Sequence, residues 1–279
     1  MLTEKKKLLD GYSIPAVGYG TVFLKGETCA QAVEAAIRNG YRLIDTAIRY
    51  DNEAAVGEGI RRANVPREEL FVTSKLRAQF YGDEQVAIEM IEESCFRLGL
   101  DYIDLYLLHW PNPNQDKYVD AWRALIAAQK KGLVRSIGVC NFMPEHIERL
   151  ESETGVLPVV NQIEMHPYFN QAEQRAYDAR KGIVTEAWSP LSRGRTVIYD
   201  ETLQKIADAK HKTVAQIILR WHYECGVIAI PKAESTSHQR DNLAIFDFEL
   251  TEEEMRVINS LTQQEGRIDN QHPREYEEF

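Results

Sequence analysis

The 279-residue sequence lacks the cysteine and histidine spacings that mark structural disulfides or metal sites. Its four cysteines, Cys29, Cys95, Cys140 and Cys225, are far apart and include no C-x-x-C pair. Isolated thiols of this kind are typical of proteins in a reducing compartment. The seven histidines form no H-E-x-x-H motif and no close cluster. We therefore expect free thiols, no bound metal and a cytoplasmic protein.

Long apolar runs and an excess of positive charge are also missing. No run approaches the roughly 18 apolar residues that a membrane span needs, and "MLTEKKKLLDG" at the N-terminus turns polar at once. The formal net charge of −10 argues against a nucleic-acid partner held through its phosphates. Because no expected helix or strand has an exposed apolar face, we expect a monomer with a small-molecule substrate.

The sequence has no complete Rossmann fingerprint. "GYGTVF" and "VGEGIRR" contain paired glycines, but neither completes G-x-G-x-x-G after a strand with an acidic residue downstream. Gly57 and Gly59 lie within a helical pattern, so we expect them to permit close packing of that helix. A dinucleotide, if one binds, is not held as in a Rossmann fold.

Short apolar runs alternate with amphipathic stretches along the whole chain. The runs are too short for helices and rich in Val, Ile, Leu and Tyr, which is typical of strands buried on both faces. They are "AVGYGT", "YRLIDTA", "LFVTSKL", "YIDLYLLHW", "VRSIGVCNF", "VVNQIEMH", "IVTEAWSPL" and "GVIAIPK". Helical patterns cover 28–39, 52–63, 83–99, 119–131, 144–153, 171–181, 201–210, 213–225 and 237–245.

This alternation predicts an α/β fold, a (β/α)8 TIM barrel forming one domain over 1–279. "KLLDGYSIP" predicts a β-hairpin before the barrel. An extra C-terminal helix is expected to begin at Thr251, which has Glu254 three residues later as in a capping box. An open doubly wound sheet is the alternative.

Several predicted strands end in a polar or aromatic side chain. Because TIM-barrel active sites lie at the C-terminal ends of the strands, these side chains are expected to meet. They are Asp45 with the following Tyr50, Lys75, His109, Asn141, Gln162, Glu164, Glu186, Trp188 and Lys232.

Asp45, Lys75 and Tyr50 form a plausible chain for proton donation. A free tyrosine has a pKa near ~10, too high for an efficient proton donor at neutral pH. An ammonium nearby favours the phenolate and lowers that pKa, and a carboxylate beyond the lysine keeps the lysine charged. His109, from the next strand, could orient a carbonyl oxygen by a hydrogen bond.

Each residue also has a structural interpretation. Asp45 could belong to a buried ion pair, His109 to the core, Trp188 to the barrel packing and Tyr50 to the surface. The order in which they arrive on consecutive strands favours the functional interpretation.

Seven segments together resemble the aldo-keto reductases, especially the short bacterial and protozoan members of the 2,5-diketo-D-gluconate reductase kind. These segments are "LIDTAIRYDNEAAVG", "VTSKL", "DLYLLHWP", "SIGVCNF", "NQIEMHPY", "AWSPLSRG" and "IPK". The resemblance implies an NADP-dependent oxidoreductase that reduces aldehydes and ketones, sugar ketoacids among them, to alcohols.

The resemblance also assigns roles. It makes Tyr50 the proton donor, Lys75 and Asp45 its tuning pair and His109 the residue that orients the substrate. It places the nicotinamide of the cofactor against Trp188. The other cofactor contacts that it implies are Gly20, Thr21, Cys140, Asn141, Gln162, Ser189, Leu191, Lys232, Ser235, His238 and Asn242.

The sequence departs from the family pattern in three places. Cys140 stands where serine is usual, which weakens one hydrogen bond to the nicotinamide carboxamide. In "IPKAESTSHQRDN", His238 occupies the position of an arginine that grips the 2′-phosphate, so we expect NADPH to be preferred only modestly and NADH to be usable. Arg77 stands where many relatives have a tryptophan. Together with Arg49 and Trp110 it suggests a polar or anionic substrate. The alternative is that both arginines only face solvent.

Two other functions compete with this one. Glu164 and Glu186 end adjacent strands, and a pair of carboxylates at a barrel mouth is what glycoside hydrolases use. A non-catalytic sensor that binds a nicotinamide cofactor is the second alternative. The four residues Asp45, Tyr50, Lys75 and His109 argue against both.

Overall fold

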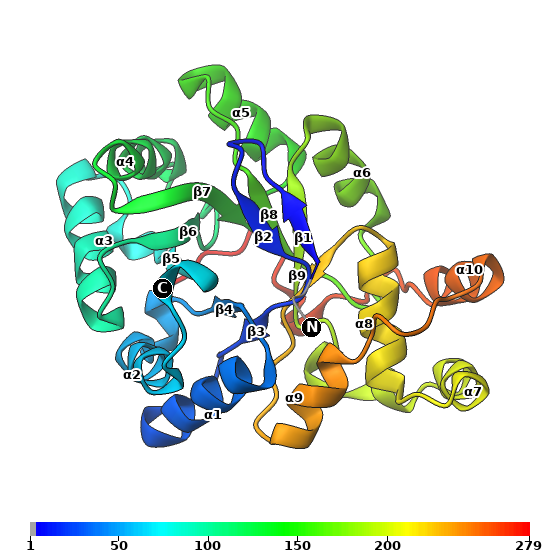
Figure 1. Cartoon of the computed structure of the whole chain (residues 1–279). Helices are drawn as coiled ribbons and strands as arrows, with labels where there is room; N and C mark the ends of the chain where they lie inside the picture. Colours follow the sequence, from blue (N-terminus) through cyan, green and yellow to red (C-terminus); the bar gives the residue numbers. More distant parts are fainter. Residues whose placement is uncertain (1–3) are drawn as a thin grey trace.

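A computed structural model describes residues 4–279 and contains an eight-stranded parallel barrel (Figure 1). The strands follow one another around the sheet in sequence order, from β3 to β10. A parallel bridge between Val17 and Ala229, with the Gly18 amide donating to the Ala229 carbonyl at 2.9 Å, joins the two ends of the sheet. The predicted TIM barrel is therefore confirmed. The strands are β3 (Tyr19–Gly20), β4 (Leu43–Asp45), β5 (Phe71–Leu76), β6 (Ile103–Leu108), β7 (Val134–Cys140), β8 (Val160–Glu164), β9 (Val184–Trp188) and β10 (Ile228–Ala229).

Helices form a ring outside the barrel, and they agree with the predicted ranges to within two residues at each end. The extra helix begins after Thr251, whose side chain accepts from the Glu254 amide in the predicted capping box. The helices are α1 (Gly26–Asn39), α2 (Glu53–Ala63), α3 (Glu84–Leu98), α4 (Tyr118–Lys130), α5 (Pro144–Thr154), α6 (Ala172–Lys181), α7 (Glu201–Lys210), α8 (Val214–Glu224), α9 (Thr236–Leu243) and α10 (Glu252–Ser260).

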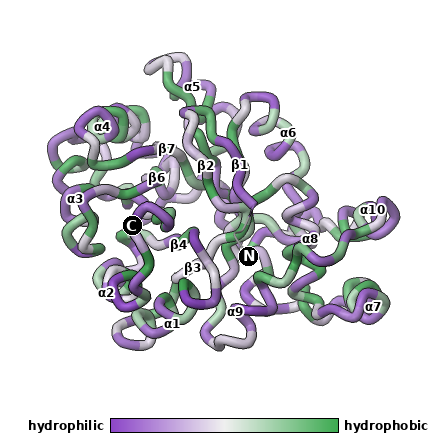
Figure 2. The backbone as a smooth tube through the Cα atoms, viewed as in Figure 1, coloured by the Kyte–Doolittle hydropathy of each residue, from purple (hydrophilic) through white to green (hydrophobic). Residues whose placement is uncertain are grey.

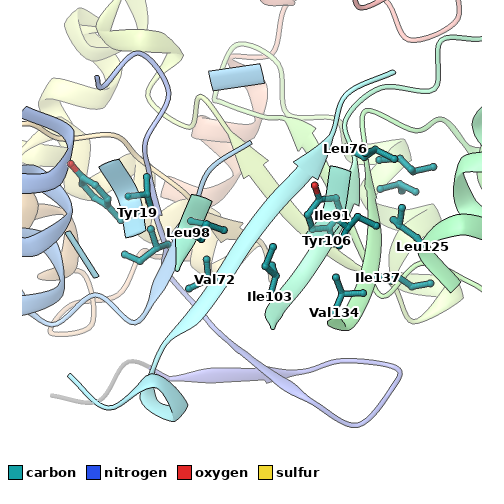
Figure 3. Close-up of a cluster of buried hydrophobic side chains, with 14 of the residues drawn as sticks. Tyr19, Val72, Leu76, Ile91, Leu98, Ile103, Tyr106, Leu125, Val134 and Ile137 are labelled. Atoms are coloured by element: carbon teal, nitrogen blue, oxygen red, sulfur yellow. The ribbon is translucent and has the colours of Figure 1, made fainter. Parts of the chain in front are cut away.

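The main hydrophobic core lies between the strands and the ring of helices. Figure 3 shows Val72, Tyr106 and Ile137 of the strands facing Ile91 and Leu125 of α3 and α4. Hydrophilic and hydrophobic segments alternate along the outer helices, as their one-sided packing requires (Figure 2).

Two glycines of α2 allow it to pack closely against its neighbours. A Cβ atom at Gly57 would collide with the Leu98 carbonyl oxygen, and one at Gly59 would lie 2.6 Å from the Ala30 carbonyl oxygen. The expectation that these glycines serve packing is confirmed.

The N-terminal hairpin closes one end of the barrel. Strands β1 (Lys5–Lys7) and β2 (Ser13–Pro15) pair antiparallel, as predicted. Leu8 and Ile14 of the hairpin pack with the inward-facing Leu43, Phe71 and Leu105 in one buried apolar cluster. The barrel interior is therefore apolar and plugged at this end, which leaves the C-terminal ends of the strands for a site.

All four cysteines are free thiols. Within residues 4–279, none of the helices combines the length and apolar character needed to cross a membrane.

Candidate active site

A cleft of about 650 Å³ opens at the C-terminal ends of the strands. It brings together most of the predicted site residues from six different strand ends. Its lining consists of Gly20, Thr21, Val22, Phe23, Asp45, Tyr50, His109, Trp110, Cys140, Asn141, Gln162, Trp188, Ser189, Arg193, Ile230 and Gln271.

The floor of the cleft contains a fully buried ion pair. Lys75 Nζ of β5 lies 2.6 and 2.8 Å from the two carboxylate oxygens of Asp45 at the end of β4, and it donates to the Thr46 carbonyl at 2.9 Å. The side chain of Lys75 is 0% exposed and that of Asp45 1%. Burial by itself would lower the pKa of Lys75, but the Asp45 carboxylate outweighs it and the net pKa is raised. Lys75 is thus held as an ammonium.

Tyr50 lies directly above this pair. It ends a short 3₁₀ helix, Ile48–Tyr50, that follows β4 and directs the phenol back over the barrel, 3.4 Å from Lys75 Nζ. Burial raises the pKa of Tyr50 above its ordinary value, although the Lys75 ammonium acts in the opposite direction. The expected lowering by the ammonium is therefore present, but in this structure desolvation outweighs it. The phenol remains protonated at neutral pH, as a proton donor must be.

A second layer of polar side chains crosses the barrel beside the ion pair. The two amide hydrogens of Gln162 are used by Asp45, at 2.8 Å, and by Glu186, at 2.6 Å. The amide oxygen of Gln162 then faces Cys140 Sγ, 3.7 Å away, at the cleft. Glu186 is completely buried, and burial followed by the charge of Asp45 raises its pKa to about 8.

Asn141 fixes the orientation of the candidate aromatic residue. It follows β7 in a left-handed conformation, with φ of 63°. Its Oδ1 accepts from the Trp188 indole at 2.8 Å, and its Nδ2 donates to the His109 carbonyl at 3.1 Å. Trp188 is only half-buried, so one part of the ring remains exposed to the cleft.

His109 is paired with a residue that the sequence did not suggest. Its Nδ1 lies 2.8 Å from Oε1 of Glu278, next to the last residue of the chain. Glu278 is 3% exposed. Consecutive acidic residues near a terminus are usually solvated, so no sequence signal marked this one.

The expected substrate residues surround the same carboxylate. Trp110 lines the cleft and stacks on Tyr276, with ring centroids 4.4 Å apart. Arg49 Nε lies 3.9 Å from Glu278 Oε1 and about half of its side chain is exposed. Arg77 Nε is buried without a hydrogen-bond partner among the described residues. Neither arginine lines the cleft, and their expected role in substrate binding stays a prediction.

The loop after β10 continues outward from the cleft. The Gly20 amide donates to the Pro231 carbonyl at 3.2 Å, which places Lys232 near the glycine end of the cleft. Lys232 pairs with Glu234 at 2.7 Å. Ser235 caps α9 by accepting from the His238 amide. Arg240, two residues after His238, donates to Asn39 instead of facing this loop.

The remaining expected residues lie outside the lining of the cleft. Leu191 is half-buried behind Ser189, and Asn242 is buried in α9. Glu164 accepts from the Ile268 amide at 2.5 Å and contacts His166. Neither Glu164 nor Glu186 reaches the cleft surface, which argues against the glycoside hydrolase alternative. Over residues 4–279, the His, Cys, Asp and Glu side chains form no group suited to a metal ion.

Comparison with known proteins agrees with the barrel fold and with the family that the sequence resembles. Residues 16–263 match the family described as the Aldo/keto reductase family. The chain therefore belongs to the aldo/keto reductase family.

Individual relatives are similar over almost their full length. Methylglyoxal reductase DkgA of Salmonella typhimurium is 46% identical over 258 residues, which cover 92% of this chain and 93% of the relative. 2,5-diketo-D-gluconic acid reductase B of Corynebacterium sp. is 44% identical, covering 98% and 97%. The crystal structure of a point mutant of Gox0644 in complex with NADPH superposes with a TM-score of 0.94 at 38% identity, covering 99% and 100%.

The raised pKa of Glu186 predicts a pH-dependent stability that a single substitution removes. Folding favours the protonated form of Glu186. Its contribution to the free energy of unfolding is therefore complete below the ordinary carboxyl pKa and is lost as the pH rises towards about 8. Glu186→Gln keeps the shape without the titration. Its free energy of unfolding should exceed that of the wild type at high pH, and the difference should shrink towards acidic pH.

Urea unfolding across this pH range measures the effect, with Glu252→Gln in the exposed first turn of α10 as the control. Parallel pH profiles for wild type and Glu186→Gln would contradict the assignment of a protonated Glu186.

Proposed function

We propose that this protein is an NADPH-dependent carbonyl reductase that converts small aldehydes and ketones to alcohols. The observation that carries the proposal is the buried Lys75–Asp45 pair directly under the Tyr50 hydroxyl, with His109 in the same cleft. The pair is fully buried, and because a buried ion pair is by itself weak support for stability, its place under the hydroxyl favours a role in proton donation.

The donors and acceptors of the cleft fit a nicotinamide cofactor. The Gln162 amide oxygen faces only a weak donor, the Cys140 thiol at 3.7 Å, so it suits the carboxamide nitrogen of nicotinamide as an acceptor. The exposed part of Trp188, fixed by Asn141, suits stacking of the nicotinamide ring. When bound, the reduced cofactor supplies a hydride to the carbonyl carbon.

The same chain of residues extends to the other parts of the cofactor. The pyrophosphate would lie along Gly20, Thr21, Ser189 and Leu191. The adenosine end of the cofactor would contact Lys232, Ser235, His238 and Asn242. Cys140 would contribute little to the carboxamide, because a thiol is a weak hydrogen-bond donor.

Tyr50 would deliver the proton that the alcohol oxygen needs. As negative charge develops on that oxygen, the Tyr50 hydroxyl transfers its proton and becomes a phenolate. The Lys75 ammonium, 3.4 Å away, stabilises the phenolate, and Asp45 keeps the ammonium in place. His109 would hold the carbonyl oxygen towards Tyr50.

The relatives and the cleft support a proposal for the substrate class. Two relatives are named for reduction of methylglyoxal and of 2,5-diketo-D-gluconic acid. We propose small carbonyl compounds as substrates, with Trp110 in the lining of the cleft and Arg49 and Arg77 beside Glu278. NADPH consumption on adding methylglyoxal tests this directly. Binding of NADPH without consumption would instead favour a sensor.

Replacing Tyr50 by Phe tests the proton donor. The change removes the hydroxyl and keeps the ring, so turnover should fall at least ~10²-fold, the usual worth of general acid catalysis. Cofactor affinity, measured by quenching of tryptophan fluorescence, should barely change. Tyr199→Phe, at a side chain that is 77% exposed, is the matched control. A Tyr50→Phe enzyme that kept more than about a tenth of wild-type turnover, with chemistry limiting, would refute the role.

The loop after β10 predicts only a modest preference for NADPH. A charge-assisted hydrogen bond contributes ~1.5–3 kcal/mol. Without the arginine, the preference for NADPH over NADH should therefore be smaller by about one to two orders of magnitude than in a site that has it. The ratio of kcat/KM for NADPH and NADH at fixed salt measures it. His238→Arg should raise this ratio, whereas Arg240→Ala should leave it unchanged because Arg240 is turned to Asn39. A wild-type ratio above ~10³ would mean that another residue replaces the arginine.

A further inference from the structure

The C-terminal segment after α10 crosses the mouth of the cleft and is fixed there by specific contacts. Gln271 lines the cleft, and the Tyr276 ring stacks on Trp110. The red end of the chain passes behind the strands, at the end of the barrel opposite the hairpin (Figure 1). Near its end, Glu278 and Asn112 exchange two hydrogen bonds, each of 3.1 Å, between the Glu278 backbone and the Asn112 side chain. Glu278 is therefore held at a defined place.

This anchoring places a buried carboxylate against His109, one of the residues that line the cleft. Oε1 of Glu278 lies 2.8 Å from Nδ1 of His109, and Oε2 accepts from the Ala78 amide at 3.4 Å. Burial would raise the pKa of Glu278, but His109, the Ala78 amide and Arg77 together outweigh it and lower the pKa, so the group is a carboxylate at neutral pH. Because the contact uses Nδ1, Nε2 remains the ring nitrogen available to a substrate.

Two arginines nearby, Arg49 and Arg77, offset part of the charge of this carboxylate, and Arg77 lowers the pKa of Glu278. Arg49 is 3.9 Å away and half of its side chain is in solvent, where water screens the pair. Glu278 itself is buried, so its charge acts on its surroundings through a medium of low polarity.

Building on the proposed carbonyl reduction, we infer that Glu278 is a specificity-determining residue: it orients His109 and disfavours carbonyl compounds that carry a negative charge next to the reacting group. The carboxylate on Nδ1 and a substrate on Nε2 would lie on opposite sides of the imidazole ring, and in this buried setting two negative charges repel each other across the ring. A substrate carboxylate beside His109 would meet this repulsion, whereas the neutral ester or aldehyde of the same size would not. The sequence suggested that Arg49 and Arg77 favour anionic substrates. The inference is the opposite, because Glu278 disfavours them.

Ligand binding tests the inference without turnover. Calorimetric titration with benzoate and with its neutral analogue benzamide compares a charged and an uncharged ligand of the same shape. In Glu278→Gln, benzoate should bind at least about 10-fold more tightly than in the wild type, while benzamide affinity should change little. The titration is run with the protein alone and with NADP⁺ added.

Glu277→Gln is the matched control, because it removes the same charge from the adjacent residue. Glu277 Oε1 accepts from the Asn114 amide at 2.7 Å and makes no contact with His109. This variant should leave the discrimination between benzoate and benzamide at the wild-type level. An equal gain in benzoate affinity in both variants would show a general charge effect and overturn the inference.

Turnover gives a second, separable readout. The ratio of kcat/KM for methyl pyruvate and pyruvate, which differ in one charge beside the same ketone, should fall at least about 10-fold in Glu278→Gln. If the ratio and the benzoate affinity stay unchanged while methyl pyruvate is reduced, the inference fails and the proposed function stands. If the wild type reduces neither compound nor methylglyoxal, the proposed function fails, and the benzoate titration still decides the role of Glu278.

Discussion

The candidate site depends on one interaction, the ion pair between Lys75 and Asp45 inside the barrel. Removing two charges from water is costly, and the pair persists because every part of it is compensated: Asp45 accepts from Lys75 and Gln162, and Lys75 also donates to the Thr46 carbonyl. The result is a cation at a fixed place, 3.4 Å below the Tyr50 hydroxyl. A mobile surface lysine could not stabilise a phenolate in this way, because solvent would screen its charge.

The barrel makes this pair possible by separating its two ends. On the hairpin side the interior is apolar and sealed by Leu8 and Ile14. Towards the C-terminal ends of the strands the interior becomes polar, first with Glu186 and Gln162 and then with the ion pair. Gln162 connects these layers and leaves its amide oxygen to the cleft. Parallel strands place all of these side chains at one end although they come from distant parts of the sequence.

Much of this arrangement could be predicted from the sequence. Buried strands and amphipathic helices have clear periodicity, so the barrel, the hairpin and the capped helix at Thr251 were predictable. The order of Asp45, Tyr50, Lys75 and His109 along consecutive strands pointed to one cleft. Two features were not predictable. The net rise of the Tyr50 pKa depends on desolvation, which only the packed structure reveals. Glu278 reaches His109 through the path of the C-terminal segment, and its local sequence resembles a solvated tail. The single domain over 1–279, the monomeric state and the cytoplasmic location stay predictions.

The most direct test of the ion pair is the rate of hydride transfer in a single turnover, compared between Lys75→Met and Asp45→Asn. Both substitutions break a buried pair and should destabilise the fold by ~3–5 kcal/mol, so each variant is first shown to be folded by circular dichroism. If the Lys75 charge acts on Tyr50 and Asp45 only holds it, Lys75→Met should abolish the step and Asp45→Asn should slow it less. Faster hydride transfer in folded Lys75→Met than in folded Asp45→Asn would contradict the account.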